Sequence, residues 1–142
     1  MTFWKKFAIA LAIILALMMV AVGTTMVLWP PINDVTTGET PEYPDLEPRT
    51  YEHDIDTVYL ASLEAIDDLG LWSVEDSDNP HRIEATRETR LFNFIDDITI
   101  TLDGDASSTT VYLRSRSRTG EADFGQNARN IHEFYDTLDI QL

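Results

Sequence analysis

The chain opens with an unbroken apolar segment. Residues 7–29, FAIALAIILALMMVAVGTTMVLW, contain no charged side chain. A helix rises about 1.5 Å per residue, so a helix of this length crosses a hydrocarbon layer of about 30 Å. Trp4 and Trp29 bracket the segment, and amphipathic rings favour the two membrane interfaces. We therefore predict a transmembrane helix over residues 7–29, preceded by a short N-terminus of residues 1–6.

A cleaved signal peptide is the alternative, because Ala21 and Gly23 are small residues at a plausible cleavage spacing. Signal peptides have an apolar core of about 7–15 residues, whereas this run continues to Trp29, which favours a retained anchor. Lys5 and Lys6 precede the segment and acidic residues follow it. The positive-inside rule therefore predicts a single-pass protein of the cell membrane, with a cytoplasmic N-terminus and an extracytoplasmic C-terminal domain.

Residues 30–53 hold five of the six prolines. Proline lacks an amide donor and biases the preceding residue toward extended backbone. The sequence therefore predicts an extended linker over residues 30–53 and a folded domain over residues 54–142. Part of the linker, around Tyr43 to Tyr51, is expected to lie along the surface of that domain.

Two segments of the domain have the period of an amphipathic helix. Apolar residues recur every three or four positions from Ile55 to Leu69, with Asp54 as the N-cap and Gly70 as the stop. A second helix is expected to begin near Asp123, whose spacing to Gln126 fits a capping box. Its apolar face consists of Phe124, Ala128, Ile131, Tyr135 and Leu138.

Four segments between these helices have the pattern of strands: residues 71–76, 81–89, 91–102 and 109–118. Phe92 and Phe94 share the phase of Asp96, which we interpret as a bulge or bend at Asp96 and Asp97. We predict an α+β two-layer domain, a four-stranded antiparallel sheet with two helices over one face. Alternation directs these strand residues to the core: Ile83, Ala85, Ile98, Ile100, Leu102, Val111 and Leu113.

Charge separates the two parts of the chain sharply. All 25 acidic residues follow the apolar segment, against 8 arginines and no lysine, which gives that part a net formal charge of −17. Such a surface repels nucleic acid, so we expect no nucleic-acid partner. A high-salt habitat is one hypothesis for this bias, since salt screens the self-repulsion. The absence of cysteine excludes disulfides and thiolate sites.

The most specific pattern spans residues 114–129, RSRSRTGEADFGQNAR. Together with Asp96 and Asp97, it resembles the family catalogued as domain of unknown function 1499. In that family a strand with paired aspartates precedes an Arg-Ser-x-Ser-Arg-x-Gly-x-x-Asp-x-Gly-x-Asn run that enters a final helix. The resemblance implies a membrane-anchored or exported domain and brings no established activity. The matching positions are Asp96, Asp97, Arg114, Ser115, Ser117, Arg118, Gly120, Asp123, Gly125, Asn127 and Arg129.

The motif has two interpretations. Guanidinium groups and a helix N-terminus favour a small anionic ligand, such as a phosphate or carboxylate. The other interpretation, which we favour, pairs the arginines with carboxylates across the sheet: Glu84, Glu88, Asp96, Asp97 or Asp123. The candidate ligand-binding residues are Arg114, Arg118, Asp96, Asp97, Asp123 and Asn127. The residues assigned to structure are Ser115, Ser117, Gly120, Gly125 and Arg129.

No catalytic residue, metal or cofactor is predicted. Asp96, Asp97 and Asp123 would hold one divalent cation only if a bulge turned the adjacent pair together. His53, His81 and His132 are scattered over different segments, without a partner at diagnostic spacing. We expect a membrane-anchored extracytoplasmic domain with a binding or structural role in an envelope protein assembly. The alternative is a module that binds a small anionic ligand, or a hydrolase-like enzyme that uses the Arg/Asp motif.

Overall fold

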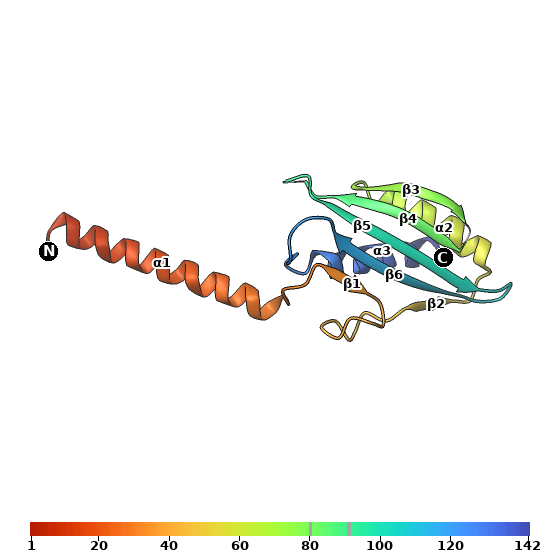
Figure 1. The fold of residues 1–142 in the computed structure, drawn as a ribbon, viewed down its shortest axis with the longest axis horizontal. Helices are drawn as coiled ribbons and strands as arrows, with labels where there is room; N and C mark the ends of the chain where they lie inside the picture. The colour runs from red at the N-terminus through yellow and green to blue at the C-terminus, as the bar shows by residue number, and fades with distance from the viewer. Residues whose placement is uncertain (80, 91) are drawn as a thin grey trace.

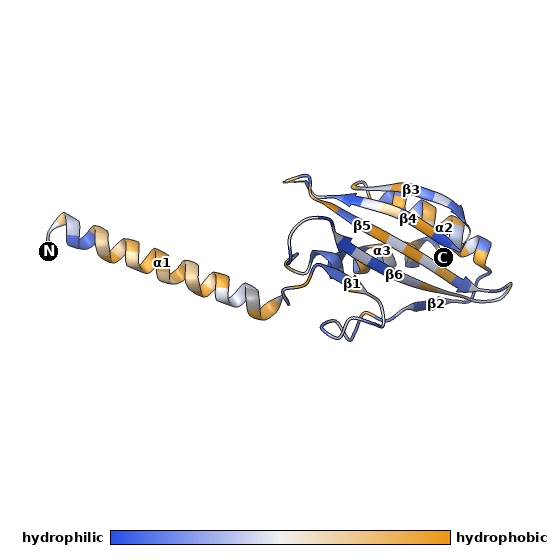
Figure 2. Ribbon diagram, in the orientation of Figure 1, coloured by the Kyte–Doolittle hydropathy of each residue, from blue (hydrophilic) through white to orange (hydrophobic). Residues whose placement is uncertain are grey.

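The computed structural model describes residues 1–79, 81–90 and 92–142, which form a long N-terminal helix followed by an α+β domain (Figure 1). Helix α1, Phe3–Leu28, extends away from the domain and is apolar along most of its length (Figure 2). It is long and apolar enough to cross a membrane, and no part of its most apolar window is buried against the rest of the described chain.

The domain contains two further helices and six strands. The helices are α2, Ile55–Asp68, and α3, Gln126–Gln141. The strands are β1 Asp34–Thr36, β2 Arg49–Tyr51, β3 Trp72–Asn79, β4 Arg82–Glu88, β5 Ile95–Gly104 and β6 Thr109–Ser117. Their order in the sheet is β1-β6-β5-β4-β3, with β2 also paired to β6, and every pairing is antiparallel.

The prediction of a four-stranded sheet is therefore wrong, because the sheet has six strands. Both additional strands come from residues 30–53, which the proline content predicted to be an extended linker. β1 and β2 lie along the free edge of β6, and this segment buries Val35 and Leu46 in the core. Each strand has only three residues, which is too short for alternation to identify it.

Helices α2 and α3 lie on the same face of the sheet and leave the other face open (Figure 1). Asp54 caps α2 by accepting a hydrogen bond from the amide of Thr57, as expected. The seven strand residues predicted to face the core are all buried. Phe134 on α3 stacks on Trp72 inside this core, with ring centroids 6.0 Å apart.

Two details of the prediction are wrong. Phe124 was assigned to the apolar face of the last helix but is 59% exposed, because α3 begins only at Gln126, after the left-handed backbone of Gly125. No bulge occurs at Asp96 and Asp97: the pairing of β5 with β4 and with β6 is regular through both residues. Asp96 simply shares the phase of Ile98 and points into the core, where it is 2% exposed.

Candidate functional site

Strand β6 divides the motif between the two faces of the sheet. Ser115 is fully buried and faces α3, whereas Arg114 and Arg116 are exposed on the open face. Successive side chains of a strand point to opposite faces, so the alternation of serine and arginine in RSRS separates two sets of contacts. The candidate residues are thus not one site but two groups on opposite sides of the sheet.

The first group is a buried polar cluster beneath the first turn of α3, formed by Asp96, Ser115, Ser117, Asn127 and Asn130. Asn127 is completely buried and accepts a hydrogen bond of 2.6 Å from the hydroxyl of Ser115. Its amide nitrogen lies within 2.6–3.0 Å of three acceptors, so its two hydrogens are shared among them. The acceptors are the Asn33 carbonyl, the Ser117 hydroxyl and the Asp123 carboxylate. Asn127 therefore ties α3 to β6 and to the segment before β1.

Asp96 is the charged member of the buried polar cluster. Its carboxylate accepts hydrogen bonds from the hydroxyl of Ser117 at 2.7 Å and from the amide of Asn130 at 2.9 Å. Nη1 of Arg87, on β4, lies 4.0 Å from the same carboxylate, and both side chains are largely buried. Among the residues that the structure describes, Nε and Nη1 of Arg87 have no hydrogen-bond partner. Asp96 therefore balances the charge of a buried arginine.

Arg87 and Asn130 were absent from the candidate residues, although the sequence held a signal for both. Arg87 has the phase of Ile83 and Ala85 in β4, and Asp96 has the phase of Ile98 in β5. Opposite charges in the core phase of neighbouring strands indicate a buried pair. Asn130 lies three residues after Asn127, on the same helix face.

The turn into α3 is held by its own side chains. The carboxylate of Asp123 accepts hydrogen bonds from the amides of Gly125 at 2.8 Å and Asn127 at 2.7 Å. Gly120 and Gly125 have φ values of +84° and +77°, a region that favours glycine. Arg129 donates from Nη1 to the carbonyl of Phe124 at 3.0 Å. These contacts use the free amides and carbonyls of the turn that would otherwise face a ligand.

The second group consists of arginine–carboxylate pairs on the open face. Arg114 forms a two-pronged pair with Asp34, with distances of 2.9 and 2.6 Å. Arg118 contacts one oxygen of Asp97 at 2.9 and 2.6 Å. Asp97 was among the expected partners, but Asp34 was not, because it lies in the segment predicted to be a linker. Both pairs are half-exposed, so each is expected to contribute little to the stability of the domain.

We expect the Arg114–Asp34 pair to make a small, pH-dependent contribution to stability. The hydrogen bond from Arg114 holds the pKa of the Asp34 carboxyl below its ordinary value of 3.8. A lowered pKa stabilises the fold above the unfolded value, and this stabilisation is lost as the pH falls through the folded pKa. The melting temperatures of the parent and Asp34→Asn should therefore differ at pH 7 and converge below about pH 3.8. A difference that stays constant down to pH 2 would contradict this assignment.

This geometry does not bring the candidate residues together around a ligand. Arg114 and Arg118 are both bound to carboxylates on the open face. Asp96 and Asp97 point to opposite faces, so the adjacent pair does not chelate a single cation. Within residues 1–79, 81–90 and 92–142, no three His, Asp or Glu residues are placed to hold a metal ion. The contacts of the motif join α3, β6 and the N-terminal segment that carries β1.

One of three comparisons with known proteins agrees with the motif. No curated protein matches the sequence. Among solved structures, CalU16 from Micromonospora echinospora is 12% identical and has a TM-score of 0.49, over 76% of this chain and 80% of that one. The family model described as "Protein of unknown function (DUF1499)" matches residues 27–138, which include all six strands and most of α3. The chain therefore belongs to the DUF1499 family.

Proposed function

We propose that this chain is a single-span membrane protein whose domain lies outside the cytoplasm and has a binding or structural role in an envelope protein assembly. The observation that carries the proposal is the bare surface of α1. Its 26 residues are almost entirely apolar, and none of its most apolar window is covered by the domain. Apolar surface of this extent is unfavourable in water and is matched by the hydrocarbon of a bilayer.

Charge supports the orientation. Lys5 and Lys6 lie at the start of α1, and the 25 acidic residues all follow it. Positive residues are retained on the cytoplasmic side of a span, which leaves the acidic domain on the other side. Only five residues separate the end of α1 at Leu28 from the start of β1 at Asp34, so the domain is held close to the membrane.

The contacts of the motif support binding or structure in preference to catalysis. Its buried residues are hydrogen-bonded to one another, and its exposed arginines are paired. A catalytic base or nucleophile needs a free side chain within reach of a substrate. The alternative of an anionic ligand on Arg114 and Arg118 would require that ligand to displace Asp34 and Asp97.

Membrane retention tests the proposal. We expect the full-length chain to stay in the membrane fraction after an alkaline carbonate wash, and a chain that begins at residue 30 to be released. Intact mass should show an N-terminus that is not cleaved near Ala21 or Gly23. Release of the full-length chain, or a mature protein that begins after residue 21, would contradict the anchor.

The assembly role has its own test. After extraction in mild detergent, the full-length chain should co-purify with another envelope protein in constant proportion, and a monomer without a partner would contradict the role. Arg116→Glu changes the open face, and Leu60→Ala changes an exposed position on α2 as a matched control. If the open face binds the partner, only Arg116→Glu should reduce its recovery.

A further inference from the structure

Three phenylalanines of the domain are exposed to solvent and are not part of the core. Four phenylalanines follow α1, and only Phe134 is buried. Phe92, Phe94 and Phe124 are 67%, 50% and 59% exposed. Large aromatic side chains contribute most to stability when buried, so three exposed rings in one region indicate a surface that is covered by something else.

The three rings belong to two loops at one end of the sheet. Phe92 and Phe94 lie between β4 and β5, with ring centroids 5.5 Å apart, and Phe124 lies between β6 and α3. Antiparallel pairing brings both loops to the same end, which is the end where α1 leaves the domain (Figure 1). All three rings line one cleft of about 320 Å³ between the loops. They therefore form a continuous apolar surface, which we call the phenylalanine foot.

The backbone of both loops is held in an uncommon conformation. Within the described residues, Asn93 and Phe124 are the two non-glycine residues with positive φ, at +51° and +53°. Positive φ is rare for a bulky residue such as phenylalanine, and costs energy that the surrounding structure must supply. Phe124 belongs to the phenylalanine foot and Asn93 lies between its other two residues, so the fold holds the ring of Phe124 outward at a cost to its own stability.

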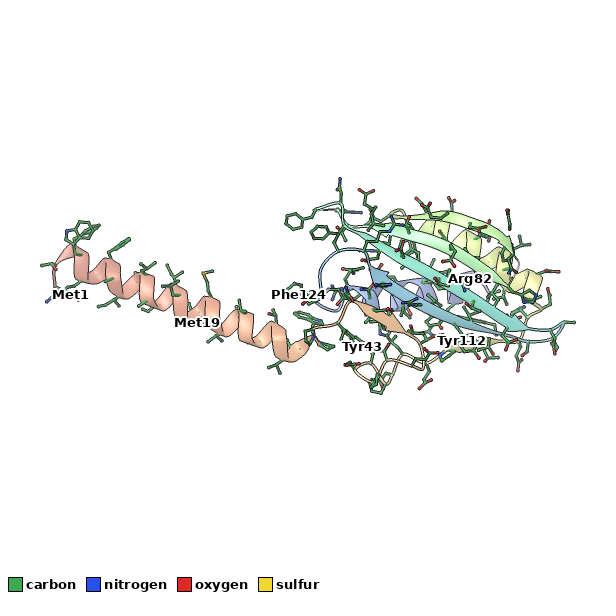
Figure 3. The ribbon with its side chains drawn as sticks, in the orientation of Figure 1. Met1, Met19, Tyr43, Arg82, Tyr112 and Phe124 are labelled. Atoms are coloured by element: carbon green, nitrogen blue, oxygen red, sulfur yellow. The ribbon has the colours of Figure 1, made fainter. Side chains whose placement is uncertain are left out.

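The phenylalanine foot adjoins the end of α1. The indole of Trp29 lies directly against Gly125, so closely that a Cβ atom there would overlap it. Figure 3 places Phe124 beside the point where α1 joins the domain. Tryptophan favours the interface of a bilayer, and Trp29 immediately follows α1. If α1 spans a membrane, the rings beside Trp29 are at the level of its headgroups.

The loop that carries Phe92 and Phe94 contains no acidic residue. Arg90 is the sole charged residue of the loop from 89 to 94, although the chain after α1 carries a net formal charge of −17. Two acidic segments lie toward the opposite end of the sheet: EDSDN at 75–79 in the second half of β3, and DGD at 103–105 where β5 ends. The loop that carries Phe124 contains Glu121 and Asp123. Of the two loops of the foot, the loop with Phe92 and Phe94 is therefore the one that carries no negative charge for anionic headgroups to repel.

We propose that Phe92, Phe94 and Phe124 insert into the outer interface of the bilayer that α1 spans, so that the domain rests on the membrane at a fixed orientation. This rests on the proposed membrane anchor. Aromatic side chains on the apolar face of a surface-bound element bury about 5–10 Å into the headgroup region. The anchor holds the domain near the bilayer surface, since only a few residues connect α1 to the domain. The rings then fix its tilt and direct the open face sideways along the membrane.

Lipid quenching tests the proposal in the full-length chain, which has no cysteine of its own. Thr119→Cys places a fluorophore in the exposed part of the foot, and Ala106→Cys places it in the turn at the opposite end. The labelled chain is reconstituted into phosphatidylcholine and phosphatidylglycerol vesicles with headgroup-region spin labels. We expect quenching at Thr119→Cys to exceed that at Ala106→Cys by at least about twofold. Replacing all three phenylalanines by serine should reduce it to the Ala106→Cys level.

The outcomes separate the two proposals. A chain that fails to float with the vesicles overturns the anchor. A chain that floats but shows equal quenching at both positions overturns the foot and leaves the anchor intact. If the rings instead bind a second copy of the chain or another protein, the fluorophore at Thr119→Cys will be as shielded from solvent in detergent without lipid as it is in vesicles. That result would overturn insertion into the membrane. Quenching that persists in the triple serine variant also overturns the role of the rings.

Discussion

Replacing Asn127 by alanine is expected to lower the free energy of unfolding by about 2–4 kcal/mol. Asn127 is fully buried, and its amide group bonds to Ser115, Ser117 and Asp123. Truncation removes these hydrogen bonds and leaves the hydroxyl hydrogen of Ser115 without its acceptor in a dry environment, where a buried unsatisfied group costs about 1–3 kcal/mol. The loss also weakens the link between the first turn of α3 and β6, which then rests on the hydrogen bond from Asn130 to Ser115.

Urea unfolding of the purified full-length chain, followed by near-ultraviolet circular dichroism in mild detergent, measures this loss. His132→Ala is the matched control, because His132 is exposed on the same helix, and it should change stability by less than about 0.5 kcal/mol. If Asn127→Ala were as mild as His132→Ala, the buried polar cluster would not support the fold. A site that is held for ligand binding alone would give that result.

Asp96→Asn is expected to be at least as costly, by about 3–5 kcal/mol, because it removes the negative charge that balances buried Arg87. Asparagine keeps the shape of the side chain, so packing is nearly unchanged and the effect reports charge. Asp97→Asn is the matched control: this neighbouring residue faces outward, and its pair with Arg118 is half-exposed. Its loss should destabilise the domain far less than the loss of the Asp96 charge.

A double-mutant cycle identifies the partner of Asp96. Arg87→Met removes the buried cation and should be destabilising alone, because it leaves Asp96 as an uncompensated charge. In the double variant both charges are gone, so the total loss should be smaller than the sum of the single losses by more than about 1 kcal/mol. Additive losses would show that the two charges do not interact, although they lie 4.0 Å apart.

The sequence predicted the elements whose pattern is local. Asp54 and the apolar stripe identify α2, and alternation identifies the inner faces of β4, β5 and β6. These features depend on periodicity and capping, which act within one element. The same logic, applied strictly, also places Asp96 in the core phase. Asp96 was interpreted as a break in the pattern because the arginine that balances its charge, Arg87, lies on another strand.

The remaining features depend on contacts between distant segments. β1 and β2 are recognisable as strands only once β6 offers an edge, and Asp34 becomes a partner of Arg114 only through that pairing. The sequence shows Asn127 only as a polar residue near the start of a helix. Its buried hydrogen bonds to Ser115 and to the Asn33 carbonyl appear only in the structure. The phenylalanine foot was missed because the last helix begins two residues later than its apolar pattern suggests, which leaves Phe124 outside it.

The side of the membrane on which the domain lies is the central claim, and cysteine labelling tests it most directly. Ala106→Cys introduces a single thiol into the exposed turn after β5, and Thr2→Cys introduces one ahead of α1. The chain has no other cysteine. Spheroplasts are treated with a maleimide that does not cross membranes. We predict that Ala106→Cys reacts at once and that Thr2→Cys reacts only after lysis. Protection of Ala106→Cys together with labelling of Thr2→Cys in unbroken spheroplasts would contradict the account.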